Sequence, residues 1–93
     1  MIASFRDDDT ELLWRTGKSR RIPASLRKSA ARKLMILNAA LAVENLRVPP
    51  GNHLEALKGD RKGQYSIRVN DQYRICFVWR GGNAHEVEIV DYH

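Results

Sequence analysis

The sequence predicts an α+β domain in which two N-terminal helices pack on one face of a small, mostly antiparallel sheet, in the order β-α-α-β-β-β. Apolar residues recur at helical spacing in the first half of the chain and at alternate positions from Gln64 onward. The later segments are joined by short turns, which favour antiparallel neighbours. A chain of 93 residues is expected to form one domain over residues 1–93, with a single core between two layers.

The first half of the chain predicts a strand followed by two helices. The opening "MIASF" is short and apolar, as in a first strand. In "DDDTELLWRTG", acidic residues in the first turn complement the helix dipole, and Gly17 can end the helix. Pro23 suits the first turn of a second helix, which "RVPPGN" ends because two prolines cannot continue it. The apolar stripe expected to face the core comprises Leu26, Ala30, Leu34, Met35, Leu37 and Leu41.

Three strands are predicted in the second half. The segments "QYSIRVN", "YRICFVWR" and "AHEVEIVDYH" each alternate in polarity, and "NDQ" and "RGGN" separate them as tight turns. One face of the sheet takes the apolar side chains, so the other is expected to show Arg68, Arg74 and Tyr92. Two arginines on an uncovered sheet face are well placed to hold phosphate. Arginines that are merely solvated are the alternative at this point.

Basic residues dominate the charge of the chain. The net charge is +5, and residues 15–33 contain eight basic side chains and no acidic one. A basic stripe is the electrostatic footprint of a phosphate backbone, but the charge fits a solvated helix face or an acidic protein partner equally well. Short apolar runs and a start without a signal-peptide pattern predict a cytoplasmic protein that makes no membrane contact. Cys76, the single cysteine, is expected to be a small core or sheet residue.

The chemistry-bearing residues indicate phosphodiester cleavage without a metal. His53, His85 and His93 are scattered and no cysteine pair exists, so we expect neither a metal site nor a cofactor. No phosphate-binding glycine loop or nucleophile elbow occurs either. Basic groups and the final acid/base residues "DYH" remain. RNA supplies its own nucleophile, the 2′-OH, so a protein needs only a base, a cation for the charged phosphorane and an acid for the leaving 5′ oxygen.

Three segments carry a family resemblance. The run "LKGDRKGQYSIRV", the strand "YRICFVW" and the final "DYH" resemble the HigB branch of the RelE/ParE toxin superfamily. The likeness covers essentially the whole chain, including the "MIASF" start. It implies a RelE/ParE-like fold and the toxin of a type II toxin–antitoxin module, a ribosome-dependent endoribonuclease that cuts mRNA in the ribosomal A site. It also implies a HigA-like helix-turn-helix antitoxin as partner, with operator DNA contacted only through that antitoxin.

The resemblance assigns the catalytic residues. Asp91, Tyr92 and His93 match the terminal catalytic cluster, Arg74 matches an arginine that contacts the scissile phosphate, and Lys58 matches a basic loop residue. His93 is then the general acid or base, and Asp91 either orients it or is the second proton-transfer group. Tyr92 stacks on a base or binds phosphate. Arg74 and Lys58 stabilise the transition state.

One position departs from the family pattern. Glu55 stands in "LEALKG" where "LHPLKG" of a HigB toxin has a catalytic histidine, and His53 is a poor substitute because it lies two residues earlier. Either the Glu55 carboxylate takes over a proton-transfer role or His93 does, which predicts a weaker toxin or one with a shifted pH optimum.

The remaining basic residues are expected to bind RNA, and they are Arg20, Arg21, Arg27, Arg61, Lys62 and Arg68. For the basic stretch of residues 15–33, we favour contact with the RNA of the small ribosomal subunit over an acidic surface of the antitoxin. Two other functions stay open. One is a ParE-like inhibitor of DNA gyrase, since one fold serves both. The other is a degenerate toxin that binds RNA or protein without chemistry.

Overall fold

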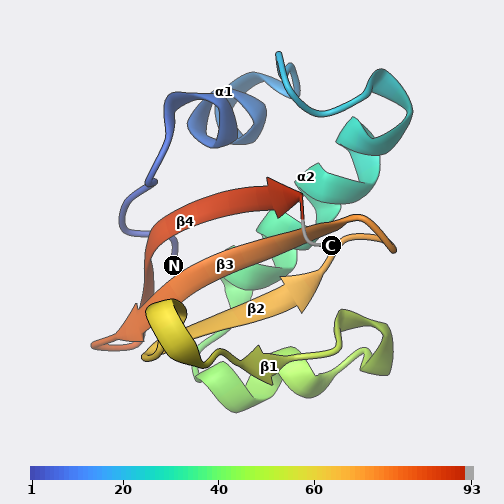
Figure 1. Cartoon of the computed structure of the whole chain (residues 1–93). Coiled ribbons are helices and arrows are strands. Elements are labelled where there is room, and N and C mark those ends of the chain that lie inside the picture. Colours follow the sequence, from blue (N-terminus) through green and yellow to red (C-terminus); the bar gives the residue numbers. More distant parts are fainter. Residues whose placement is uncertain (92–93) are drawn as a thin grey trace.

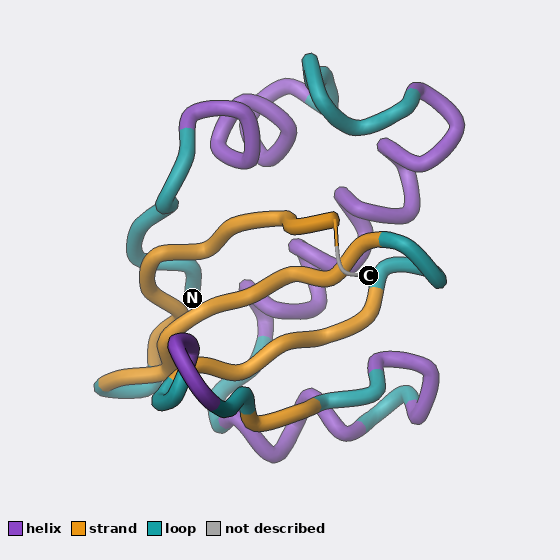
Figure 2. Tube along the Cα trace, viewed as in Figure 1, coloured by secondary structure: helices purple, strands orange, loops and turns teal. Residues whose placement is uncertain are grey.

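The computed structural model describes residues 1–91 and contains two helices and a four-stranded sheet (Figures 1 and 2). The helices are α1 (Asp8–Thr16) and α2 (Ala24–Ala39). The strands are β1 (Glu55–Ala56), β2 (Gln64–Arg68), β3 (Tyr73–Arg80) and β4 (Asn83–Asp91). Three short 3₁₀ helices are η1 (Val43–Arg47), η2 (Pro50–Asn52) and η3 (Gly59–Arg61). No helix within residues 1–91 is long and apolar enough to cross a membrane.

Helix α1 begins and ends where the sequence predicts. The Asp7 side chain caps its start by accepting the Thr10 N–H at 2.7 Å. Gly17 ends it with a φ of 79°, a left-handed conformation that glycine adopts without a steric penalty. The helix contributes Leu13 to the core and lies beside α2, next to the β4 edge of the sheet (Figure 1).

Helix α2 crosses one face of the sheet and buries Ala30, Leu34 and Leu37 (Figure 1). Two members of the expected stripe do not belong to it. Leu41 is 87% exposed because the helix already ends at Ala39, and Met35 is 63% exposed because its side chain points away from the core that Leu34 and Leu37 enter. The core between α2 and the sheet is completed by Ile67, Tyr73, Ile75, Phe77, Val87 and Ile89.

The sheet is an antiparallel meander in the order β1-β2-β3-β4, which confirms the predicted pairing of the last three strands. Gly81 and Gly82 form the turn between β3 and β4, and both have positive φ, as a two-residue hairpin turn requires. The register shifts between Cys76 and Val78, opposite Glu86, whose φ is 51°. This bulge kinks β4 near its middle.

The expected first strand is only partly present. Ile2 and Phe5 form two isolated parallel bridges with Ala84 and Val87, not a continuous ladder. The β4 bulge is the reason, because the Glu86 N–H between the bridges binds the Ser4 hydroxyl at 2.9 Å. The fourth ladder strand is instead β1, two residues for which the sequence pattern predicted no strand.

Asp9 joins α1 to the basic link before α2. Its carboxylate accepts the Ser19 hydroxyl at 2.6 Å and the Arg20 N–H at 2.6 Å. Burial alone would raise the pKa of Asp9, but these hydrogen bonds and the charge of Arg21 lower it overall. A carboxyl with a lowered pKa stabilises the fold above the pKa of the unfolded chain, and this stability is lost as the pH falls through the folded pKa.

Asp9→Asn is therefore expected to lower the free energy of unfolding at pH 7 by about 1.5–3 kcal/mol, the usual contribution of hydrogen bonds to a charged group. The difference in stability should shrink toward zero well below pH 4, where the Asp9 carboxyl is protonated in both the folded and the unfolded chain. Urea denaturation at several pH values measures it. Asp8→Asn, an exposed change in the same turn, is the matched control. An Asp9→Asn deficit that does not depend on pH would contradict this account.

Candidate functional site

The sheet face opposite α2, which we call the outer face, carries one row of polar residues across all four strands. Glu55 pairs with Ser66, Ser66 with Cys76, and Cys76 with Glu88. Paired residues point to the same side of a sheet, so all four side chains lie on the outer face. Ser66 and Cys76 are 0% exposed. The middle of this face is therefore covered, whereas the sequence predicted an uncovered face.

Arg74 covers part of the row and is held at two points. Its Nε donates to the Ser66 hydroxyl at 2.8 Å, and its Nη2 donates to the His53 carbonyl oxygen at 2.6 Å. His53 has a φ of 45°, and this left-handed backbone follows directly after η2. The guanidinium that the sequence assigned to phosphate binding is thus fixed by Ser66, through its buried hydroxyl and its carbonyl oxygen, and by the loop carbonyl of His53. Neither of these partners is indicated by a pattern in the sequence.

Arg68 lies directly opposite Arg74 in the register of β2 and β3. Like charges at directly opposite positions are destabilising, and an anion shared by both removes this cost. Arg68 also pairs with Asp71, whose side chain is 96% exposed and therefore screened by water. The two arginines expected on the outer face are confirmed as cross-strand neighbours, at the end of the sheet where β2 turns into β3.

Arg61 and Glu88 form a second charged group on the same face. Arg61 Nη1 donates to Glu88 Oε2 at 3.1 Å and to Gln64 Oε1 at 3.1 Å, which places η3 over the outer face (Figure 1). Arg6 also approaches Glu88, at 3.5 Å. The Glu88 side chain is only 14% exposed and is shared by two arginines. Sequence reasoning placed Glu88 on the outer face by its alternation with Val87 and Ile89, but gave it no role.

A pocket of about 490 Å³ opens beside this group and is lined by Glu55, Ala56, Leu57, Lys58 and Arg61. It brings together three residues that the sequence singled out separately: Glu55 from β1, Lys58 from the loop after it, and Arg61 from η3. One carboxylate and two cations therefore share one hollow next to the arginine-bearing face. Lys62 is exposed at the end of η3.

Cys76 is a buried strand residue, as expected. Burial raises the pKa of its thiol, and the nearby charges act in both directions, since Arg61 and Arg74 lower it while Glu88 and Glu55 raise it. A thiol with a raised pKa is a poor nucleophile. Within residues 1–91, no group of three or more His, Cys, Asp or Glu side chains is arranged to hold a metal ion.

The terminal cluster is described only at Asp91. Asp91 pairs with Tyr73, a core residue, so its side chain starts on the helix side of the sheet, whereas Val90 pairs with Arg74 on the outer face. The Asp91 carboxylate accepts Gln72 Nε2 at 3.0 Å at the mouth of the β2–β3 turn. Tyr92 and His93, predicted as catalytic residues, lie outside the described residues.

The basic stretch of residues 15–33 is less available to a partner than its sequence indicates. Arg21 contacts Asp7 and donates to the Ile89 carbonyl oxygen at 3.2 Å, and Arg27 donates to the Ile22 carbonyl oxygen at 2.9 Å. These two proposed RNA-binding side chains therefore stabilise the fold. Six basic residues of the stretch are exposed, and two of them, Arg15 and Arg21, form ion pairs with Glu11 and Asp7. The other four are Lys18, Arg20, Lys28 and Arg32.

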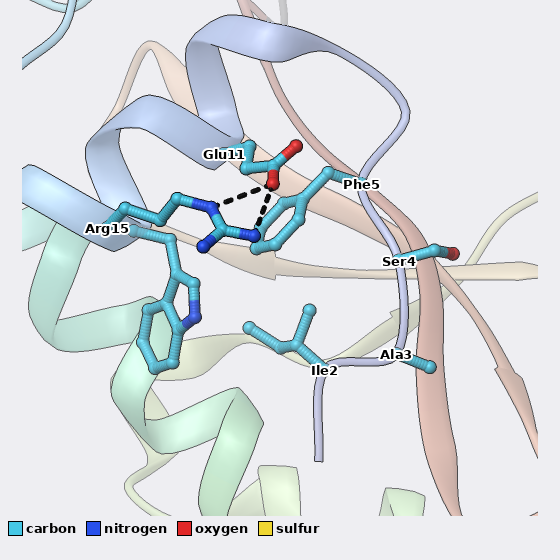
Figure 3. Close-up of a pocket in the computed structure, with 7 residues that line it drawn as sticks. Ile2, Ala3, Ser4, Phe5, Glu11 and Arg15 are labelled. Atoms are coloured by element: carbon cyan, nitrogen blue, oxygen red, sulfur yellow. Dashed lines mark hydrogen bonds and ion pairs between the residues drawn. The ribbon is translucent and has the colours of Figure 1, made fainter.

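A second pocket of about 480 Å³ lies between the N-terminal segment and α1 (Figure 3). Ile2 and Phe5 form its apolar floor, and an ion pair between Glu11 and Arg15, at 2.7 Å, crosses its rim. The Glu11 carboxylate is engaged by this arginine, and no lining residue is a histidine or cysteine. This pocket contains none of the predicted catalytic residues.

Two helices packed on a four-stranded antiparallel sheet are the architecture of RelE/ParE-like toxins. The toxin fold is seen in the structure of the YoeB-YefM complex from Staphylococcus aureus, which matches with a TM-score of 0.61 over 100% of this chain and 98% of that chain, at 14% identity. A family model described as "RelE-like toxin of type II toxin-antitoxin system HigB" matches residues 3–93. The chain belongs to this family of HigB-like toxins, and the predicted fold class is confirmed.

Two relatives extend the comparison. Toxin HigB-1 of Vibrio cholerae serotype O1 is 47% identical over 85 residues, which cover 90% of each chain. Endoribonuclease HigB of Proteus vulgaris is 32% identical over 93 residues, which cover 100% of each chain. The protein is therefore a toxin of a toxin–antitoxin module, and an antitoxin is its partner.

Proposed function

We propose that this toxin is a metal-independent endoribonuclease that cuts mRNA in the A site of the ribosome and so arrests translation and growth. The single observation that carries the proposal is the outer face, where the neighbouring Arg68 and Arg74 lie on the same side of the sheet as Glu55. A scissile phosphate held by the arginines would be within reach of the carboxylate and cations of the adjacent pocket. The name of the Proteus vulgaris relative, an endoribonuclease, supports the activity.

The chemistry proposed needs only side chains of the chain itself. A base accepts the proton of the RNA 2′-OH, whose oxygen attacks the adjacent phosphorus. The P–O5′ bond breaks as an acid protonates the leaving oxygen, which leaves a 2′,3′-cyclic phosphate and a 5′-OH. Arg74 and Lys58 stabilise the charge that develops on the phosphorane. His93 serves as acid or base, and Tyr92 stacks on a base. Asp91, whose side chain starts on the helix side and accepts Gln72 Nε2, orients His93 from the end of β4.

Glu55 is proposed as the second proton-transfer group, in the position of the family's histidine. Its strand register places it on the same face as Ser66, which holds Arg74. We expect it to approach the same phosphate from the β1 side. A carboxylate in this role implies a pH optimum lower than that of a histidine-bearing toxin, since the two side-chain types titrate about two pH units apart.

Glu55→Gln is expected to reduce the single-turnover rate of cleavage of ribosome-bound mRNA by about 100-fold, the low end of the contribution of a general acid or base. Glu55→His should retain cleavage and move the acidic limb of the pH–rate profile toward neutral pH. Asp60→Asn, in the neighbouring η3, is the matched control and should behave like the parent protein. Equal rates and equal profiles in all four proteins would exclude a proton-transfer role for Glu55.

The ribosome and the antitoxin are the proposed macromolecular partners, in the cytoplasm. The exposed cations Lys18, Arg20, Lys28 and Arg32 are available for the phosphate backbone of small-subunit RNA, which attracts such residues in a salt-dependent manner. The antitoxin is proposed to be a HigA-like helix-turn-helix protein, through which alone the complex contacts operator DNA. The solved YoeB-YefM structure is itself a complex, which supports a complex of this general kind.

A further inference from the structure

One fully buried side chain, that of Asn52, fixes the loop that leads from α2 to β1. Asn52 is 0% exposed. Its Nδ2 donates to the carbonyl oxygens of Leu46 at 3.1 Å and Val48 at 3.3 Å, and its Oδ1 accepts the Lys33 ammonium at 2.5 Å. Both amide donors and the acceptor are therefore used, and the loop is attached to α2 and to η1 through this one residue.

The loop that Asn52 fixes ends in an unusual backbone conformation at His53. The residue has a φ of 45° and a ψ of 57°, and its N–H donates to the Pro50 carbonyl oxygen at 3.1 Å. A left-handed conformation at a non-glycine residue costs free energy and persists only where the surroundings hold it. Asn52 immediately precedes His53, and its three hydrogen bonds supply such a hold. The conformation directs the His53 carbonyl oxygen to Arg74 Nη2, 2.6 Å away.

These contacts connect α2 to the outer face of the sheet through Lys33, Asn52, His53 and Arg74. We propose that Asn52 is a positioning residue for Arg74, because it fixes the left-handed turn whose carbonyl oxygen holds the guanidinium in place. The inference rests on the proposed function, in which Arg74 contacts the scissile phosphate. It adds a residue that touches neither RNA nor the reacting atoms.

The environment of Lys33 supports the importance of this contact. Burial, followed by the positive charges of Arg32 and Arg68, lowers the pKa of Lys33. The surroundings of Lys33 therefore disfavour the charged ammonium. The hydrogen bond to the Asn52 amide oxygen offsets part of this cost.

The consequence for cleavage lies in the chemical step. An arginine side chain is flexible, so a guanidinium that is already held loses less entropy when it meets the transition state. A displacement of a catalytic group by about 1 Å can cost about 10²-fold in rate. Loss of Asn52 should therefore lower kcat, while the exposed cations that attract the ribosome remain and leave KM nearly unchanged.

The test compares Asn52→Ala with Asn38→Ala. Asn38 is the matched control because its Oδ1 accepts the Ile2 N–H at 2.9 Å and so also anchors a distant segment, but to the N-terminus. Asn52→Ala is expected to lower kcat for ribosome-bound mRNA by about 10- to 100-fold with KM changed less than about threefold. Asn38→Ala should keep the parent kcat. In nuclear magnetic resonance spectra, the Arg74 Nε–Hε signal should move in Asn52→Ala and stay in place in Asn38→Ala.

Measurements in the Arg74→Ala variant distinguish a failure of the Asn52 inference from a failure of the proposed function. In Arg74→Ala, the further change Asn52→Ala should have no additional effect on kcat, because the group that Asn52 positions is already absent. If Arg74→Ala cuts like the parent, the proposed role of Arg74 fails, whatever Asn52→Ala does to the Arg74 signal. If Arg74→Ala is inactive but Asn52→Ala has the parent kcat and the parent Arg74 signal, the positioning role alone fails.

Lys33→Met provides the same test if Asn52→Ala does not fold. Of the three hydrogen bonds of Asn52, this variant removes the one to Oδ1, together with the Lys33 charge, and keeps the two from Nδ2. A smaller loss of kcat together with a displaced Arg74 signal is expected. A parent-like kcat and signal in Lys33→Met would then overturn the inference.

Discussion

Arg74→Ala is expected to reduce cleavage of translated mRNA by about 10²- to 10³-fold, the usual cost of removing one donor that stabilises an oxyanionic transition state. The expectation rests on the position of Arg74 beside Arg68 and on its two-point attachment to Ser66 and His53. Single-turnover cleavage on programmed ribosomes measures it. Arg74→Lys should recover only part of the activity, since an ammonium cannot reproduce the fork of hydrogen bonds that the guanidinium makes to Ser66 and His53.

Arg80→Ala is the matched control for this variant, because Arg80 lies on the same strand but exposed at its other end. The free energy of unfolding of both variants should be measured beside the rates, because Arg74→Ala removes the hydrogen bonds to Ser66 and His53 as well as the like-charge pairing with Arg68. Equal cleavage rates for the Arg74 and Arg80 variants would contradict the assignment of the outer face as the phosphate site.

His93→Ala is expected to have an effect at least as large, about 10²- to 10⁴-fold on the rate, as for the loss of a general acid or base. Removal of both Tyr92 and His93 should abolish growth inhibition, while binding to the ribosome and to the antitoxin persists. His85→Ala is the matched control, because this histidine contacts only the Arg80 carbonyl oxygen among the described hydrogen bonds. A truncated protein that still cuts ribosome-bound mRNA would exclude the terminal cluster from the mechanism.

Much of the fold was predictable because local signals agreed with the tertiary structure. The acidic first turn and Gly17 mark α1 correctly, and the alternation from Gln64 onward predicts three antiparallel strands. The predicted N-terminal strand does not form a continuous ladder, because β4 bulges at Glu86. A bulge is not visible in an alternating sequence pattern. The two-residue strand β1 is too short to produce any periodicity.

For the candidate site, the sequence predicts which sheet face each side chain lies on, but not which groups it hydrogen-bonds to. Alternation places Arg68 and Arg74 on one face, and only the register shows that they are directly opposite. The attachment of Arg74 depends on a buried serine and on a backbone carbonyl, neither of which has a sequence signature. A run of basic residues also cannot show that Arg21 and Arg27 are bound within the fold.

The central claim is that the outer face and the terminal cluster together form a ribonuclease site that acts on ribosome-bound mRNA. Primer extension on mRNA translated by purified ribosomes tests it directly, with the parent protein, Arg74→Ala and His93→Ala compared at equal concentration. Cuts within codons are expected for the parent, strongly reduced in both variants and absent when the same mRNA is offered without ribosomes. Growth arrest by the parent protein with no such cuts, together with inhibition of DNA gyrase or with no enzyme activity at all, would contradict the claim.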